Sequence, residues 1–337
     1  MIHVRFAVAL MLAACTTQAR EPAAPSTEAA TCGLAESYAG GEWLSRDDVT
    51  LWYSARGPVD APAVVFLHGG PGYNGYVFER AVGDALTERV RLVVLDQRGC
   101  GRSANLDAEA ELGLDATLDD LEALRRHLGI ERWTVLGHSF GGLLAAAYAL
   151  RHPDSTAGVI LVETTPSLPR ALEHQLQTTA AAAPERWPDH ADAIAAVANG
   201  DGRPFDRLLR LYGLTGRESL QALLHWHDPS NQARADRWDE QSGLLQCTRP
   251  RVLEAFAADG LLDGERSTWA GALPRPGVLI GGARSNVIGE AELTRAAESW
   301  GVDRLTMAES GHFPYVEEPA AFVEAVHSAA ETFHDPP

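Results

Sequence analysis

The sequence predicts an α/β fold in which a mostly parallel central sheet carries helices on both faces. Short, nearly continuous apolar runs recur along the chain, as is typical of buried parallel strands. Stretches with apolar residues at helical spacing separate these runs, so strands and helices alternate. The alternation stops over residues 165–272, which are rich in alanine, tryptophan and charge and predict an inserted helical lid.

Each expected element follows from its local pattern. Val49–Tyr53 alternates and predicts an early, exposed strand. Thr117–Leu124 opens with a capping-type residue and carries leucines at helical spacing, which predicts a helix. Further strands are expected at Ala63–Leu67, Arg91–Leu95, Trp133–Leu136, Gly158–Val162, Gly277–Ile280 and Val302–Leu305. Further helices are expected at Gly142–Leu150 and around Glu290–Trp300, and in the lid at Arg170–Ala182, Ala191–Ala198, Phe205–Tyr212 and Glu218–His225.

The first residues predict a bacterial lipoprotein signal. Residues 1–14 end in an apolar run too short to span a bilayer. Leu12–Cys15 resembles a lipobox, which makes Cys15 the expected lipidation site; an ordinary secretory signal cut after Ala14 or Ala19 is the alternative. Thr16 takes the place of an aspartate that would favour inner-membrane retention. We therefore expect a periplasmic lipoprotein anchored to the outer membrane.

Composition and net charge indicate the domain organisation and the expected class of partner. Residues 15–35 contain little to bury and predict a flexible tether, followed by a core in two parts, residues 36–164 and 273–337, on either side of the lid. The formal net charge of -18 argues against nucleic acid and anionic membrane surfaces as partners. The expected partner is a small molecule or short peptide, with membrane contact only through the lipid; the oligomeric state is left open.

Three cysteines follow the tether. An oxidising compartment permits one disulfide, and we expect it between Cys32 and Cys247 because Cys100 lies inside a loop motif as a small buried filler. No cysteine and histidine spacing suggests zinc, and His225–Asp228 is interpreted as packing or surface. We expect neither a metal nor a cofactor.

The sequence Gly-His-Ser-Phe-Gly at Gly137–Gly141 fits the pattern of a serine on a sharp turn between a strand and a helix. This pattern makes Ser139 the candidate nucleophile. Gly311–Pro314 follows the last expected strand, so His312 stands where the order serine, acid, histidine requires the general base.

Two glycine-containing loops follow the strands that end at Leu67 and Leu95. In the first, His68–Gly72, glycines let backbone N–H groups face an oxyanion, and we assign the N–H groups of Gly70 and Phe140 as its donors. His68 is interpreted as a structural residue that holds this loop. In the second, Asp96 and Arg98 are expected to pair and fix the loop beside the site.

These two loops and the serine turn together resemble the α/β-hydrolase superfamily, and within it the proline iminopeptidase branch of serine peptidases. The resemblance covers roughly residues 40–164 and 273–330, and the lid offers no match. Phe140 departs from the tryptophan that usually follows the serine in that branch. The resemblance implies the hydrolase fold, Ser139 as nucleophile, His312 as base and the two backbone donors.

The carboxylate expected to pair with His312 departs from the pattern of this family. The usual aspartate would follow the strand Gly277–Ile280, but Ser285 stands in its place, with Asn286 next. Neither side chain balances an imidazolium with a full charge. Glu163 directly follows the neighbouring strand, as in certain haloalkane dehalogenases, and adjacent strands lie about 5 Å apart. We therefore expect Glu163 as the acid; a brace for the lid hinge is its alternative role.

The leading functional hypothesis is a serine hydrolase that releases N-terminal residues from small peptides through an acyl-enzyme. That activity needs lid carboxylates for the free amine, and Glu173, Glu185 and Asp189 are unranked candidates. The same triad would serve an esterase, lactonase or amidase, because the shape of the lid sets specificity. A catalytically weak lipoprotein that binds a ligand is a further alternative, supported only by the missing aspartate.

Overall fold

The computed structural model describes residues 32–334 except residues 108, 248–249 and 263–270. The predicted signal peptide, the lipidation site Cys15 and most of the tether lie outside the described residues. Within these ranges, no helix is both long enough and apolar enough to cross a bilayer.

Eight strands form one sheet in the order β1-β2-β4-β3-β5-β6-β7-β8. The first two strands run antiparallel to their neighbours and all other pairs are parallel. The predicted fold class is confirmed. The strands are β1 (Gly41–Ser45), β2 (Thr50–Arg56), β3 (Ala63–Leu67), β4 (Arg91–Leu95), β5 (Trp133–His138), β6 (Thr156–Val162), β7 (Gly277–Gly282) and β8 (Asp303–Met307). The edge strand β1 was not expected, because its side chains are largely exposed and it has no apolar run.

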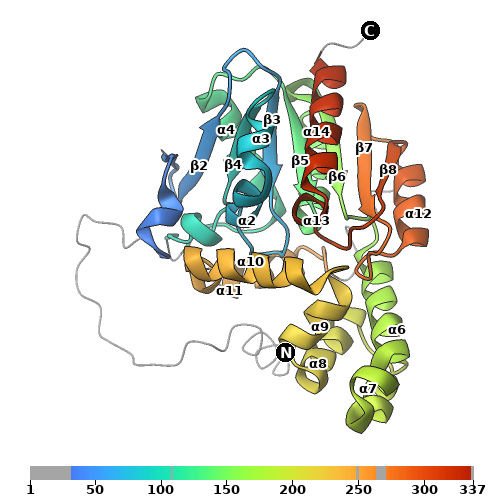
Figure 1. Ribbon diagram of the computed structural model, residues 1–337. Helices are drawn as coiled ribbons and strands as arrows, with labels where there is room; N and C mark the ends of the chain where they lie inside the picture. Colours follow the sequence, from blue (N-terminus) through green and yellow to red (C-terminus); the bar gives the residue numbers. More distant parts are fainter. Residues whose placement is uncertain (1–31, 108, 248–249, 263–270, 335–337) are drawn as a thin grey trace, which may run out of the picture.

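Helices cover both faces of the sheet (Figure 1). Alternate strand residues face opposite sides, so Val65 and Leu67 belong to one core cluster while Val64 and Phe66 belong to the other. The first cluster includes residues of α4 (Leu114–His127), α5 (Phe140–Arg151) and α12 (Glu290–Trp300). The second includes residues of α2 (Tyr76–Phe78), α3 (Asp84–Leu86), α13 (Pro314–Glu317) and α14 (Pro319–His334).

The segment between β6 and β7, predicted as a lid, is mainly helical in its described part, and we refer to it as the lid. Its helices are α6 (Leu168–Arg186), α7 (Ala191–Ala198), α8 (Pro204–Thr215), α9 (Arg217–Leu224), α10 (Pro229–Ser242) and α11 (Pro250–Ala258). Helix α10 lacks a clear apolar pattern because three of its four buried side chains, Gln232, Asp239 and Ser242, are polar, which is why the sequence did not predict it. Figure 1 shows α10 and α11 crossing one end of the sheet.

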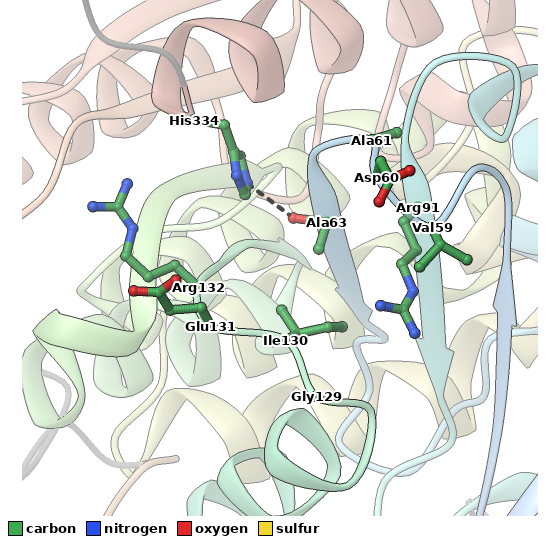
Figure 2. Close-up of a pocket in the computed structure, with 10 residues that line it drawn as sticks. All are labelled: Val59, Asp60, Ala61, Ala63, Arg91, Gly129, Ile130, Glu131, Arg132 and His334. Atoms are coloured by element: carbon green, nitrogen blue, oxygen red, sulfur yellow. Dashed lines mark hydrogen bonds between the residues drawn. The ribbon is translucent and has the colours of Figure 1, made fainter.

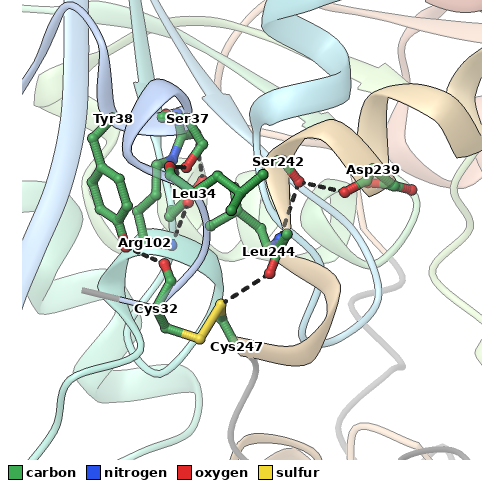
Figure 3. Close-up of a disulfide and its surroundings, with 11 residues drawn as sticks. Cys32, Leu34, Ser37, Tyr38, Arg102, Asp239, Ser242, Leu244 and Cys247 are labelled. Atoms are coloured by element: carbon green, nitrogen blue, oxygen red, sulfur yellow. Dashed lines mark hydrogen bonds and ion pairs between the residues drawn. A yellow bond between two sulfur atoms is a disulfide. The ribbon is translucent and has the colours of Figure 1, made fainter. Parts of the chain in front are cut away.

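A disulfide joins the start of the described chain to the lid, and Figure 3 shows its surroundings. Cys32 and Cys247 are bonded as expected, and Cys100 is a buried free thiol. Next to the disulfide, the backbone N–H of Leu34 donates to the carbonyl of Ser242 at 2.8 Å. These links fix the carboxyl end of α10 against the segment that precedes β1.

The loop after β4 contains two buried ion pairs, but the expected pairing of Asp96 with Arg98 is wrong. Arg102 donates to both carboxylate oxygens of Asp96, at 2.7 and 3.0 Å. Arg98 instead donates to both oxygens of Asp120 on α4, at 2.7 Å each. Asp96 also accepts from the backbone N–H of Gly75 at 2.8 Å, so it ties two loops together.

We expect Asp120→Ala to destabilise the fold by about 3 to 5 kcal/mol, because it leaves the buried Arg98 without its main partner. Both side chains are under 5% exposed, and the partners left to Arg98 among the described residues are the more exposed Asp48 and the carbonyl of Glu111. Urea unfolding measures the change. The control is Asp119→Ala on the same helix, where the pair with Arg151 is exposed and contributes under about 1 kcal/mol. Equal effects of the two substitutions would contradict the prediction.

Candidate active site

Ser139 lies on a sharp turn between β5 and α5. Its φ of 54° and ψ of -123° place it outside the regions that side chains usually adopt. Its backbone N–H donates to the carbonyl of Val162 at 2.8 Å, which fixes the turn against the end of β6. Because α5 begins at Phe140, the N–H groups of its first turn have no carbonyl acceptor within the helix, and that of Gly142 donates instead to the carbonyl of Ser139 at 2.9 Å.

Close packing explains the glycines of this turn. A Cβ at Gly137 would lie 2.2 Å from the carbonyl oxygen of Gly141, and a Cβ at Gly141 would lie 2.2 Å from that of Leu67. A side chain at Gly137 would push against the start of α5, and a side chain at Gly141 would push the turn away from β3. The strained serine conformation therefore depends on both glycines.

The loop after β3 contacts Ser139 directly. A Cβ at Gly69 would lie 2.9 Å from the Cβ of Ser139, and Gly70 has a φ of 121° that favours glycine. His68 holds this loop, as predicted: its Nε2 accepts from the backbone N–H of Gln97 at 3.1 Å, and its carbonyl accepts from the Gln97 amide at 2.9 Å. The structure thus places the predicted oxyanion donors Gly70 and Phe140 on the two segments that meet at Ser139.

His312 follows β8 and lies beside the serine turn. The ring of His138, the residue before Ser139, donates from Nε2 to the carbonyl of His312 at 2.8 Å. The centroids of these two rings are 4.8 Å apart. The nucleophile candidate and the base candidate, 173 positions apart in the sequence, therefore lie on adjoining loops at the carboxyl end of the sheet.

Glu163 contacts the other side of the His312 ring. It directly follows β6, its side chain is fully buried, and its Oε2 lies 3.1 Å from Nδ1 of His312. Its φ of 48° turns the side chain toward β7, where the backbone N–H of Gly282 donates to Oε1 at 2.6 Å. Ser285, which replaces the usual aspartate, donates from its hydroxyl to Oε2 at 2.5 Å.

Burial governs the charges of this pair. It raises the pKa of the Glu163 carboxyl, and hydrogen bonds from Ser285 and Gly282 oppose that rise. Burial lowers the pKa of His312, so its ring is neutral near pH 7. The hydrogen bonds donated by Gly282 and Ser285 favour the ionised carboxylate, and an ionised Glu163 can only accept the Nδ1 proton of His312. The Nε2 of His312 is then left with a lone pair, as a general base requires.

The lid also holds the His312 loop, through contacts that the sequence did not predict. The backbone N–H of His312 donates to the carbonyl of His225 at 2.7 Å, and the two rings stack with centroids 5.4 Å apart. The carboxylate of Glu317 accepts from the backbone N–H groups of Gly311 at 2.6 Å and His227 at 2.8 Å. Two features of the sequence could have indicated these contacts: the histidine cluster in the lid, and Glu317 soon after His312.

The sequence reasoning missed Asp239, a lid carboxylate that contacts the loop after β3. Its Oδ2 accepts from the hydroxyl of Tyr73, three residues after Gly70, at 2.7 Å. Its Oδ1 is buried and has no hydrogen-bond partner among the described residues. The three lid carboxylates that were expected to bind a substrate amine have other surroundings. Glu173 pairs with Arg207 within the lid. Glu185 and Asp189 are exposed.

Figure 2 shows a separate hollow of about 610 Å³ that includes Ala63, Arg91 and Ile130. Ala63 and Arg91 begin β3 and β4, and Ile130 precedes β5. This hollow therefore lies at the amino ends of the strands, whereas Ser139 lies at the carboxyl end of β5. Ligands of open α/β sheets bind at the carboxyl ends, so the hollow is not part of the candidate active site. Across the described ranges, no three His, Cys, Asp or Glu side chains are grouped to hold a metal ion.

Comparisons with known proteins identify the family. The family model described as alpha/beta hydrolase fold matches residues 62–319. A proline iminopeptidase of Arabidopsis thaliana is 36% identical over 166 residues, which cover 49% of this chain and 43% of that protein. A probable proline iminopeptidase of Leptolyngbya boryana is 42% identical over 115 residues, covering 33% of this chain and 34% of its own length. The aligned segments thus span less than half of either relative.

Solved structures extend the similarity over nearly the whole fold. The crystal structure of a proline iminopeptidase-related protein from Thermus thermophilus has a TM-score of 0.71 and 25% identity, and the match covers 87% of this chain and 97% of that one. An esterase from Rhodococcus has a TM-score of 0.62 at 21% identity over 87% of this chain and 99% of its own, which shows the shared fold alone. The chain therefore belongs to the α/β-hydrolase family, with proline iminopeptidases among its relatives.

Proposed function

We propose that this protein is a serine hydrolase that works through an acyl-enzyme, with Ser139 as nucleophile, His312 as general base and Glu163 as acid. The observation that carries the proposal is the hydrogen bond between Nδ1 of His312 and the buried Glu163 carboxylate, beside the strained Ser139 turn. This arrangement fits the order and roles of a catalytic triad.

In the proposed mechanism, the Ser139 hydroxyl oxygen attacks the substrate carbonyl while Nε2 of His312 takes its proton. The N–H groups of Gly70 and Phe140 hold the negative charge that forms on the carbonyl oxygen. His312 then gives the proton to the leaving amine, and water releases the acyl group by the same steps. Glu163 stays ionised throughout and stabilises the transient imidazolium.

We further propose that the substrate is a short peptide from which the N-terminal residue is released. Asp239 supports this substrate class, because a carboxylate with one oxygen unpartnered among the described residues can accept from a substrate ammonium. Its link to Tyr73 attaches it to the loop that carries Gly70. Trp226 and Phe313, half-buried and stacked with centroids 4.6 Å apart, add an apolar surface beside His312 that suits a proline ring.

We expect Asp239→Asn to raise the KM for substrates with a free N-terminal amine by about 10- to 100-fold, because a charge-assisted hydrogen bond is lost. Asparagine still accepts from Tyr73, so the loop keeps its contact. Burial raises the pKa of Asp239 to about 7. Since only the ionised carboxylate attracts an ammonium, the KM of the wild type should rise as the pH falls below about 7.

Prolyl and other aminoacyl naphthylamides, their N-acetylated forms and short acyl esters provide the measurement. Asp239→Asn should leave turnover of N-acetylated substrates and esters near the wild-type value. Glu240→Gln, at an exposed position on the same helix, is the matched control. Faster turnover of esters than of prolyl amides by the wild type would instead favour an esterase or lactonase with the same triad.

A further inference from the structure

We propose that Ser285 is a positioning residue that fixes the relocated acid Glu163 against His312. This inference rests on the proposed function, since it concerns the residue that orients the acid of that triad. It gives a role to the serine that stands where the sequence pattern requires an aspartate.

The backbone sets the two residues side by side. Strands β6 and β7 are parallel neighbours with Val162 paired to Ile280, and the backbone N–H of Glu163 donates to the carbonyl of Ile280 at 2.9 Å. The loop after β7 then turns back, with the N–H of Ser285 3.2 Å from the carbonyl of Gly282. The Ser285 side chain thereby reaches the buried carboxylate and is itself only 7% exposed.

The direction of the hydroxyl proton follows from the partners of Ser285. The backbone N–H of Ile288 points to its Oγ at 3.4 Å, so this contact uses the oxygen as an acceptor. The single hydroxyl proton is then donated to Oε2 of Glu163, the same oxygen that faces Nδ1 of His312. Ser285 therefore fixes the carboxylate oxygen that orients the base, and stabilises it in the ionised form.

Other charged groups act on the same carboxylate. Arg304 on β8 favours its ionised form and Glu290 on α12 disfavours it. On the far side of His312 lie the rings of His138 and His225, each held neutral near pH 7 because burial lowers its pKa. None of these groups donates a hydrogen bond to Glu163, so loss of the Ser285 hydroxyl has no replacement among them.

The test uses the second-order rate of Ser139 labelling by a fluorophosphonate, measured against pH, which requires no knowledge of the substrate. Ser285→Ala should lower this rate about 10-fold, because one hydrogen bond to a charged group is lost. The acidic limb of the profile should also move to higher pH, because protonation of Glu163 becomes easier. Ser285→Thr, which keeps the hydroxyl, should retain most of the wild-type rate and its profile.

A second arm asks whether position 285 can carry the charge itself. Glu163→Gln combined with Ser285→Asp should label at least about 10-fold faster than Glu163→Gln alone, because the new carboxylate lies within reach of Nδ1 of His312. Asn286→Asp in the same background is the matched control. The Asn286 side chain points instead to the carbonyl of Leu223, with which it makes a 2.9 Å hydrogen bond, so no gain is expected there.

The outcomes separate this inference from the proposed function. A wild-type protein that is not labelled at Ser139 overturns both. If the wild type is labelled and Glu163→Gln is slow, but Ser285→Ala keeps the wild-type rate and pH profile, then only the role of Ser285 is overturned. Equal rates for Ser285→Ala and Ser285→Thr would likewise contradict it, because the hydroxyl is the group invoked.

Discussion

Ser139→Ala is expected to lower kcat by about 10⁶-fold. The substitution removes the proposed attacking oxygen, and the proposed oxyanion donors at Gly70 and Phe140 cannot form an acyl-enzyme without it. Alanine tolerates the φ of 54° about as poorly as serine does, so the free energy of unfolding should change little. Turnover of the preferred amide or ester substrate and a urea unfolding curve measure the two quantities.

Fluorophosphonate labelling gives an independent reading of the same prediction. The wild type should gain one adduct, which mass spectrometry places on Ser139, and Ser139→Ala should gain none. Ser328→Ala, at an exposed position on α14, is the control and should label like the wild type. An adduct that persists in Ser139→Ala would assign the reactive serine to another position.

The parts of the site that the sequence predicted are those encoded by local patterns at strand ends. The serine turn and the His68–Gly72 loop each follow a strand directly, and His312 lies five positions after the end of β8. In a mostly parallel sheet the carboxyl ends of neighbouring strands meet at one edge, so these segments converge. Glu163 follows the same logic, because β6 lies between β5 and β7.

The contacts that the sequence did not predict depend on tertiary packing. Asp96 and Arg98 are close in sequence and opposite in charge, yet they do not pair with each other. Asp96 binds Arg102, and Arg98 binds Asp120 on α4. Asp239 lies on a helix whose buried face is mainly polar. Because the helix has no apolar periodicity, neither the helix nor the position of Asp239 could be predicted from the sequence. Proximity in sequence says little about such partners, because the fold decides which loop each side chain reaches.

Glu163→Gln is expected to lower kcat by about 10⁴-fold, and the hydrogen bonds around the carboxylate explain why. The N–H of Gly282 donates to Oε1, so a glutamine would place its amide oxygen there. Its NH₂ group would then face Nδ1 of His312, which must accept, and the ring proton would move to Nε2. In that tautomer His312 has no lone pair for the Ser139 proton.

Glu163→Asp is the informative companion, because it keeps the charge but shortens the side chain. We expect its loss in kcat to be smaller, about 10- to 100-fold, since a displaced carboxylate still stabilises the imidazolium. A urea unfolding curve distinguishes a catalytic role of Glu163 from a purely structural one. Glu163→Gln removes a buried charge, so its free energy of unfolding should equal or exceed that of the wild type. A low kcat in a protein that unfolds at wild-type urea concentration would mark Glu163 as the acid, whereas wild-type turnover by Glu163→Gln would reduce it to a brace at the start of the lid.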